Sequence, residues 1–207
     1  AVHADGTIAC WGVNDYGRLG NGTSTRASVP VAVQGLAGPA VQVSGGRQHT
    51  CAVLASHAVQ CWGFGYDGEL GDGNQTSSDT PVTAMGVSAL QVACGYGHTC
   101  AILTDHTVAC WGYNGSGELG DGTYNERPLS APVMNLANVT ELRAHGGTNC
   151  ALEMDHSVWC WGYGPDGEIG AGQNGNSPVP VQVPGIAAED LTAGLGHICA
   201  ILMDGSV

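Results

Sequence analysis

Residues 46–73 read GRQHTCAVLASHAVQCWGFGYDGELGDG, and the stretch returns in altered form further along the chain. Residues 95–122 read GYGHTCAILTDHTVACWGYNGSGELGDG, and residues 146–172 read GGTNCALEMDHSVWCWGYGPDGEIGAG. The tripeptide CWG marks the period, because it begins at Cys10, Cys61, Cys110 and Cys160. A self-similar period of about 50 residues is typical of repeat architectures. The sequence therefore predicts a tandem array.

Each repeat contains the pattern of four short strands. After the quoted stretch come a polar loop, a Pro-Val segment and a Val-rich segment, as in DTPVTAMGVSALQVACGYG at residues 79–97. Alternating apolar residues bounded by glycine and turn residues indicate strands. Four strands per repeat are typical of a β-propeller blade. We expect an all-β propeller of four-stranded blades in a single array over residues 1–207. Its predicted units are about 1–51, 52–100, 101–150 and 151–199, with a partial unit at 200–207.

A tight turn is predicted between the third and fourth strands of each unit. In AVHADGTIAC, residues 1–10, the centre Ala4-Asp5-Gly6 suits a three-residue hairpin loop with glycine in the left-handed region. Histidine, one of the few other residues enriched in that conformation, stands at the same position in three units: His57, His106 and His156. The hairpin register then places three cysteine pairs opposite each other: Cys51 with Cys61, Cys100 with Cys110, and Cys150 with Cys160.

The repeat resembles that of the RCC1 (regulator of chromosome condensation) family along the whole chain. The resemblance is carried by VSGGRQHTCAVL at 43–54, VACGYGHTCAIL at 92–103 and LTAGLGHICAIL at 191–202. It is also carried by GRLGNG, GELGDG, GELGDG and GEIGAG, which begin at Gly17, Gly68, Gly117 and Gly167. The family's seven-bladed ring implies that these four units are part of a larger ring. It also implies that His49, His98 and His197 are buried and bond the backbone.

The paired cysteines favour disulfides over metal or redox chemistry. Zinc sites need gaps of two to four residues between ligands, and the chain has no CxxC motif. A disulfide stapling each outer hairpin predicts an oxidising location, which is extracellular, cell-surface or periplasmic. Cys10 and Cys199 each lack the in-phase cysteine with which they would form a disulfide. This indicates that the chain is a segment of a longer array. Cys94 shares a small-residue position with Gly45, Ala193 and, in the third unit, His145, so we expect a buried, inert thiol.

Charge and motifs exclude several classes of function. The chain has a net charge of −13, and its five basic residues, all arginines, are scattered, so nucleic acid is not an expected partner. No apolar stretch is long enough to span a membrane. The acidic loops lack the ligand pattern of a calcium loop, and no catalytic motif such as GxSxG or HExxH occurs. We therefore expect no metal and no cofactor.

These observations favour a non-enzymatic extracellular propeller that binds a protein or glycan or serves as a scaffold. Alternatives are a guanine-nucleotide exchange factor for a small GTPase, a secreted enzyme inhibitor and, with least support, a hydrolase or lyase. The segments 14–26, 66–79, 114–127 and 165–177 are predicted as inter-blade binding loops because they vary most between repeats. The proposed anchors are Tyr16, Arg26, Tyr66, Tyr124 and Arg127. Candidate N-glycosylation sequons lie at Asn21, Asn74, Asn114 and Asn138.

Overall fold

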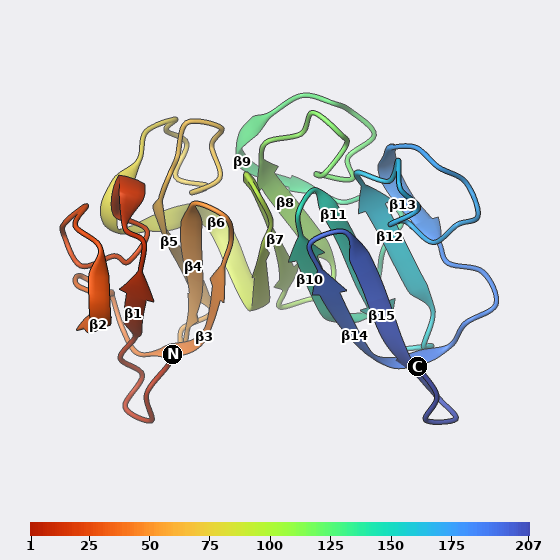
Figure 1. Ribbon diagram of the computed structural model, residues 1–207, viewed down its shortest axis with the longest axis horizontal. Helices are drawn as coiled ribbons and strands as arrows, with labels where there is room; N and C mark the ends of the chain where they lie inside the picture. The colour runs from red at the N-terminus through yellow and green to blue at the C-terminus, as the bar shows by residue number, and fades with distance from the viewer.

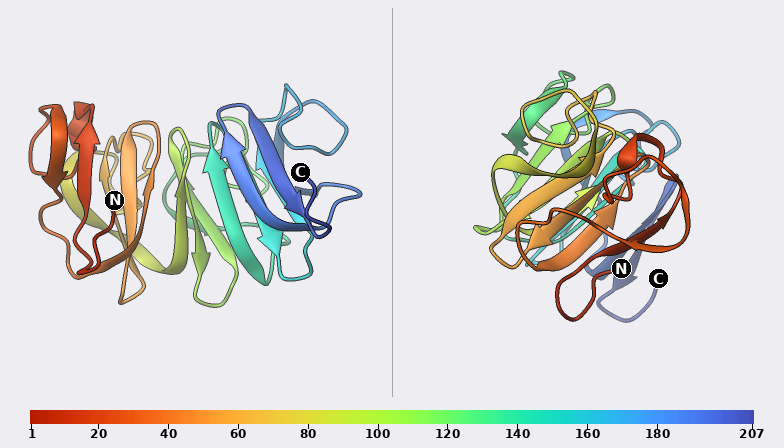
Figure 2. Two further views of the ribbon diagram at one scale, coloured as in Figure 1. Left: turned by 60° about the horizontal axis from the view of Figure 1, so that its bottom comes forward. Right: turned by 90° about the vertical axis from the view of Figure 1, so that its left-hand side faces the viewer.

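The computed structural model describes residues 1–207 and is all-β apart from one short 3-10 helix, η1 (Asp15–Gly17). Its sheets stand side by side as the blades of an incomplete propeller (Figures 1 and 2). The N-terminal pair consists of β1 (Ala9–Gly12) and β2 (Ala27–Ala32), and the C-terminal pair of β14 (Ala188–Gly194) and β15 (His197–Leu202). None of its helices is long and apolar enough to cross a membrane.

Three complete blades lie between these pairs, and all their neighbouring strands are antiparallel. Blade A consists of β3 (Ala40–Gly45), β4 (His49–Leu54), β5 (Ala58–Gly63) and the first part of β6 (Ser78–Cys94). Blade B consists of the rest of β6, β7 (His98–Leu103), β8 (Val108–Gly112) and β9 (Arg127–Pro132). Blade C consists of β10 (Val139–His145), β11 (Thr148–Glu153), β12 (Val158–Gly162) and β13 (Ser177–Gln182).

One disulfide staples the middle of each complete blade. The structure joins Cys51 to Cys61, Cys100 to Cys110 and Cys150 to Cys160, and each pair lies directly opposed across its hairpin. This hairpin connects the second and third strands of the blade. The prediction of a hairpin between the third and fourth strands, at the outer edge, was therefore wrong. The pairing does not depend on this error, because the turn alone sets which residues face each other.

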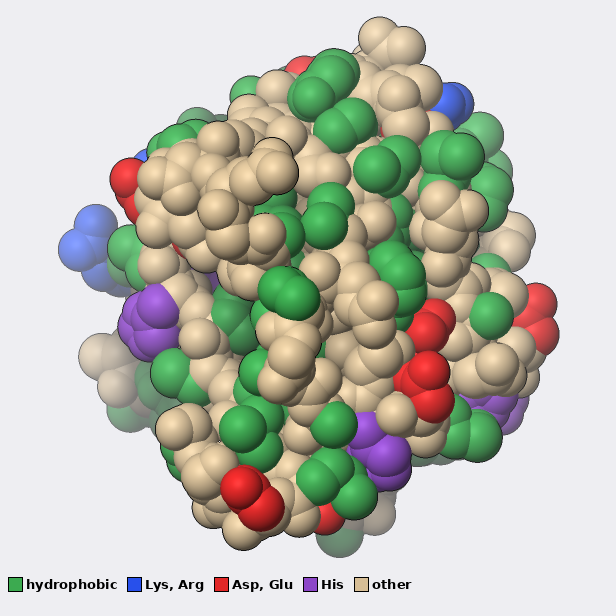
Figure 3. Space-filling view, turned by 90° about the vertical axis from the view of Figure 1, so that its right-hand side faces the viewer, with side chains coloured by type: hydrophobic (Ala, Val, Ile, Leu, Met, Phe, Trp, Pro, Cys, Tyr) green, Lys and Arg blue, Asp and Glu red, His purple; other side chains and the backbone are tan.

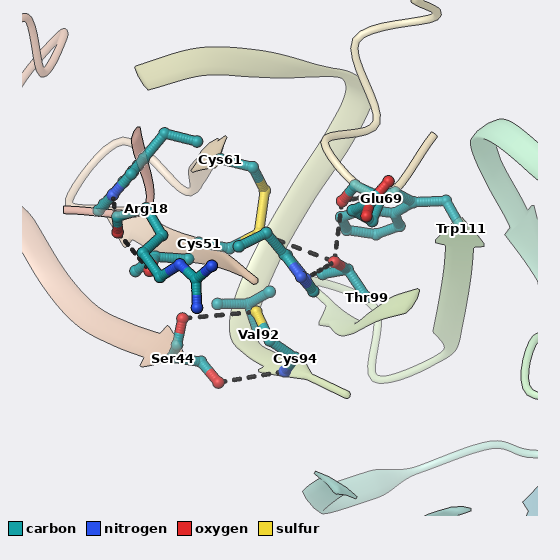
Figure 4. The surroundings of a disulfide bond; sticks show 12 residues. Arg18, Ser44, Cys51, Cys61, Glu69, Val92, Cys94, Thr99 and Trp111 are labelled. Atoms are coloured by element: carbon teal, nitrogen blue, oxygen red, sulfur yellow. Dashed lines mark hydrogen bonds between the residues drawn. A yellow bond between two sulfur atoms is a disulfide. The ribbon is translucent and has the colours of Figure 1, made fainter. Parts of the chain in front are cut away.

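Cys94 lies beside one of these disulfides and is buried without a disulfide partner (Figure 4). Its Sγ donates to the carbonyl of Ser44 at 3.4 Å, and its backbone N–H donates to Ser44 Oγ at 3.1 Å. Its position pairs with Thr99, and the equivalent position of blade C is Ala144. The assignment of His145 to this position was wrong by one residue: Cys94 lies six residues before Cys100, and the residue six before Cys150 is Ala144.

The native thiol of Cys94 is expected to resist alkylation. Burial raises its pKa to about 12, so the reactive thiolate is scarce at neutral pH. Iodoacetamide at pH 8 should modify the exposed Cys199 in the native protein and reach Cys94 only after unfolding, as measured by peptide mass mapping. Equal labelling rates for the two thiols would contradict the buried position.

Buried tryptophans fill the interfaces between neighbouring blades. Trp62, Trp111 and Trp161 are fully buried, and each indole Nε1 donates to a backbone carbonyl of the preceding blade or pair, on Arg18, Glu69 and Glu118 respectively. Trp111 of blade B packs in one core cluster with Cys51, Val53 and Leu70 of blade A. Trp11 occupies the same position in the N-terminal pair, where it is 56% exposed.

At the opposite end, apolar residues of blade C and the C-terminal pair line a groove of about 570 Å³. Figure 3 shows apolar side chains gathered over this end of the molecule.

Candidate functional site

Two sets of connections form one face of the propeller, called the loop face below. The long loops between the third and fourth strands lie along the upper edge in Figure 1. The short turns between the first and second strands lie on the same side of each antiparallel blade. The predicted binding segments therefore share this face, but they connect strands within a blade. Calling them inter-blade loops was wrong, although the first three do bond to the next blade, as when Gly73 N–H donates to Pro128 O.

The long loops are held rigidly from inside. Asn114 is fully buried, and its Nδ2 donates to the carbonyls of Thr123 and Asn125 while its Oδ1 accepts the N–H of Leu119. Gly68 shows why glycine is needed: its φ is +86°, and a Cβ there would lie 2.5 Å from Pro128 Cα in the next blade. A loop fixed in this way presents its side chains at low entropic cost.

The burial of Asn114 also determines whether its sequon can be glycosylated. Because the Asn114 amide is enclosed by its loop, it is not available as a glycan acceptor in the folded protein. Asn74 and Asn138 are exposed, and Asn21 is half-buried with its Oδ1 accepting from Asn14 and Thr23. Glycosylation of these three positions stays a prediction.

The structure brings two of the five predicted anchors together through a residue that the sequence did not single out. The ring of Phe64 lies edge-on between Tyr16 and Tyr66, with centroid distances of 4.9 and 5.1 Å. Tyr16 is 45% exposed and Tyr66 is 57% exposed. This aromatic row bridges the N-terminal pair and blade A.

The other three anchors lie apart from this row. Tyr124 is 53% exposed and makes no ring contact with another aromatic residue. Arg127 Nε is paired with Asp121 Oδ2 at 2.6 Å, so its charge is partly neutralised within its own loop. Arg26 is exposed and forms no ion pair. Elsewhere on the loop face, the guanidinium of Arg47 lies 5.1 Å from the centroid of the Tyr96 ring.

Histidines connect neighbouring blades through side chains. His49 Nε2 lies 2.8 Å from Thr99 Oγ1. The Thr99 hydroxyl donates to the carbonyl of Glu69 (Figure 4), so His49 is the donor in its bond with Thr99. His98 Nε2 likewise donates to Asn149 Oδ1 at 2.9 Å, and Asn149 Nδ2 donates to the carbonyl of Glu118. The expected bond from these histidines to the backbone was therefore wrong.

These bonds explain which histidines are structural. Burial lowers the pKa of His49 to about 3 and that of His98 to about 4, so both rings are neutral at pH 7. His197 of the C-terminal pair is exposed, contrary to the expectation of burial.

The turn histidines take the predicted left-handed conformation, and each Nδ1 also bonds a carbonyl of the next blade or pair: His57 with Ala89, His106 with Val139 and His156 with Ala188.

One group of three side chains has the composition of a metal site. His49, Cys51 and Cys94 place one ligand atom each within 4.8 Å of the others. Cys51 is bonded to Cys61, so its sulfur is not available as a thiolate. The arrangement does not fit a metal in the disulfide-bonded protein, since zinc and similar ions bind the thiolate form.

Three buried glutamates lie behind the long loops, at a position that no prediction from the sequence singled out. Glu69, Glu118 and Glu168 are at most 8% exposed. In each, one carboxylate oxygen accepts the backbone N–H of the residue two positions earlier, on Asp67, Ser116 and Asp166 respectively. Burial raises the pKa of Glu69 to about 8 and that of Glu118 above its usual value. The signal that could have revealed them is the recurrence of Glu at one position in three units.

The buried carboxyl of Glu69 predicts a measurable pH dependence of stability. Its folded pKa of about 8 exceeds its unfolded value, so the folded protein binds this proton more tightly. The resulting stability is complete below pH 4.5 and is lost as the pH rises through 8. We expect Glu69→Gln to gain about 3–4 kcal/mol relative to the unmodified protein between pH 5 and pH 8.

Urea unfolding at several pH values measures this difference. Exposed Glu189→Gln is the matched control and should leave the pH profile unchanged. A Glu69→Gln profile parallel to that of the unmodified protein would mean that Glu69 ionises as freely as a surface carboxyl.

Comparison with known proteins agrees with this architecture. The model for the "Regulator of chromosome condensation (RCC1) repeat" matches residues 5–53, 57–102 and 155–201. Human "E3 ubiquitin-protein ligase HERC2" is 38% identical over 84 residues, which is 39% of this chain and 2% of that protein. The solved structure of human WBSCR16 has a TM-score of 0.80 at 24% identity and covers 92% of this chain. Yeast RCC1 (Prp20), solved bound to Kap60, has a TM-score of 0.76 at 18% identity over 90% of this chain. The chain spans 53% and 46% of these two structures.

Proposed function

Since the chain belongs to the RCC1 repeat family, we propose that it is a non-enzymatic extracellular propeller that binds a partner protein through its loop face. The observation that carries the binding role is the row of Tyr16, Phe64 and Tyr66 on rigid loops. Aromatic side chains are enriched among the residues that dominate interface energetics, and contiguous exposed apolar groups mark interaction sites, whereas single ones do not. A solved relative, yeast RCC1, is itself described as bound to another protein, Kap60.

The extracellular location is supported by the disulfides. All three complete blades carry one at the same position. Cytosolic thiols are kept reduced, whereas secreted proteins keep such bonds. A cell-surface or periplasmic location meets the same requirement.

Nucleotide exchange on a small GTPase has less support. The chain carries five arginines, no lysine and a net charge of −13, so it offers no basic face for chromatin. Inhibition of a secreted enzyme remains compatible with the proposal, because covering an active site is a form of protein binding. A glycan partner would use the same aromatic row.

The binding proposal predicts that Tyr16→Ser with Tyr66→Ser strongly weakens partner binding. Biotinylated protein would be presented to an array of extracellular and cell-surface proteins, and positive pairs would be measured by surface plasmon resonance. Losing two exposed interface aromatics should weaken binding by about 100-fold. Tyr124→Ser, also an exposed loop tyrosine, is the matched control. Equal affinities for the two variants would contradict the aromatic row as the binding site.

Two further results would contradict the proposal as a whole. One is the turnover of a substrate by the purified protein. The other is alkylation of the six paired cysteines in intact native cells before lysis, which would mean that the protein is reduced where it functions.

A further inference from the structure

A cavity of about 480 Å³ opens on the loop face where blade B, blade C and the C-terminal pair meet. Three tyrosines from this face line it, Tyr96, Tyr113 and Tyr163, together with the carboxylates of Glu118, Asp166 and Glu168. No lysine or arginine is among its lining residues. We call this cavity the tyrosine pocket.

Glu118 directs an unpaired oxygen into the tyrosine pocket. Its side chain is 97% buried, and its Oε2 accepts the Ser116 N–H at 2.8 Å. Its Oε1 accepts no hydrogen bond from the protein and lies 3.3 Å from the point where a Cβ at Gly147 would stand. Gly147 also lines the pocket, so the missing side chain there leaves this oxygen accessible.

The equivalent glutamate of blade A makes a useful contrast. Glu69 accepts the Asp67 N–H in the same way, but its Oε1 is sealed from solvent without any partner. The same local motif thus leaves the Oε1 atom of Glu69 sealed from solvent in blade A and the Oε1 atom of Glu118 accessible in blade B. The two sites differ in which carboxylate faces the glycine of the neighbouring turn. A Cβ at Gly97 would lie 3.3 Å from Asp67 Oδ2, whereas a Cβ at Gly147 would lie 3.3 Å from Glu118 Oε1.

Three tyrosine side chains line the same pocket as this carboxylate. Tyr96, Tyr113 and Tyr163 are each about two-fifths exposed, and a Cβ at Gly147 would lie 2.9 Å from Tyr163 Cβ. An aromatic face attracts an organic cation, most strongly where water is partly excluded. The chain contains one example of this preference, because Arg47 sits over the Tyr96 ring.

We propose that the tyrosine pocket receives the guanidinium group of an arginine side chain from the partner protein. A guanidinium is flat and weakly hydrated, so it can stack on a tyrosine ring while donating to a carboxylate. The free Glu118 Oε1 accepts one N–H, and Asp166 and Glu168 add negative charge at the rim. The identity of the partner rests on the proposed function, whereas the pocket itself does not.

The pocket is tested with small probes on the intact protein. Acetyl-arginine amide is titrated while the tyrosine ring resonances are followed by NMR, and acetyl-citrulline amide serves as the uncharged analogue of the same shape. We expect citrulline to bind at least about fivefold more weakly, since it retains the flat group but lacks the charge. Nα-acetyl-lysine amide, whose side-chain amine is free and charged, should also bind more weakly than the arginine probe, because an ammonium group cannot stack on a ring.

Variants locate the probe. Glu118→Gln keeps the bond to the Ser116 N–H and removes the charge, so arginine affinity should fall at least about fivefold. Glu69→Gln is the matched control at the sealed equivalent position and should leave the affinity unchanged. The proposal is overturned if citrulline binds as tightly as arginine, if lysine binds more tightly, if calcium chloride displaces the arginine probe at equal concentration, or if Glu69→Gln weakens binding as much as Glu118→Gln.

These results are independent of the proposed function. Arginine binding without capture of any extracellular protein would contradict the proposed function and leave the pocket intact. Capture of a protein that is insensitive to Glu118→Gln, with no arginine binding, would contradict the pocket alone.

Discussion

Reduction of the three disulfides is expected to lower the free energy of unfolding by about 8 kcal/mol. Each bond joins cysteines ten positions apart. Closing a loop of that size in the unfolded chain contributes about 2.5–3 kcal/mol. The three bonds lie in different blades and share no loop, so their contributions should nearly add. The sum is comparable with the whole stability of a typical domain, so the reduced protein should be largely unfolded at 37 °C.

Urea titrations followed by tryptophan fluorescence, with and without reductant, measure this loss. The single-blade variant Cys100→Ala with Cys110→Ala should lose about a third of it. Cys94→Ala is the control, because that residue is free and small side chains occupy its position in other units. A reduced protein as stable as the oxidised one would show that packing between blades suffices without the staples.

Replacing Trp111 with alanine is expected to cost about 4 kcal/mol. The side chain is fully buried at the joint between blades A and B, where it packs against Val53 and Leu70. Truncating a buried tryptophan loses its transfer free energy and leaves a cavity. The carbonyl of Glu69 also loses the indole donor at 2.9 Å, although the Thr99 hydroxyl still bonds it. Trp111→Phe should fall between alanine and the natural residue.

Trp11 provides the matched control for this prediction. It stands at the same place in the repeat but is 56% exposed, so Trp11→Ala should change the free energy of unfolding by about 0.5 kcal/mol or less. Thermal unfolding measured by circular dichroism distinguishes the two. Equal losses for both variants would mean that the repeat position, and not burial at the joint, determines the contribution.

The sequence by itself determined the features that depend on local chemistry. The 50-residue period, strand alternation and glycine turns predicted a propeller of four-stranded blades. The three-residue turn fixed the register that places Cys51 opposite Cys61, and the left-handed preference of histidine predicted the conformation of His57. The period is visible only across several units, but the other features depend on residues within about ten positions of each other, so one unit carries the information for them.

Only the tertiary structure decided the features that join one unit to the next. His49 and Thr99 are 50 positions apart, and the indole of Trp111 bonds a carbonyl 42 positions earlier. The accessible oxygen of Glu118 lies against Gly147 of the next blade, and the aromatic row depends on loops from two units. Repeat alignment compares equivalent positions, but it does not say which non-equivalent positions touch. Blade stacking sets those contacts, because it alone determines which loop lies against which turn.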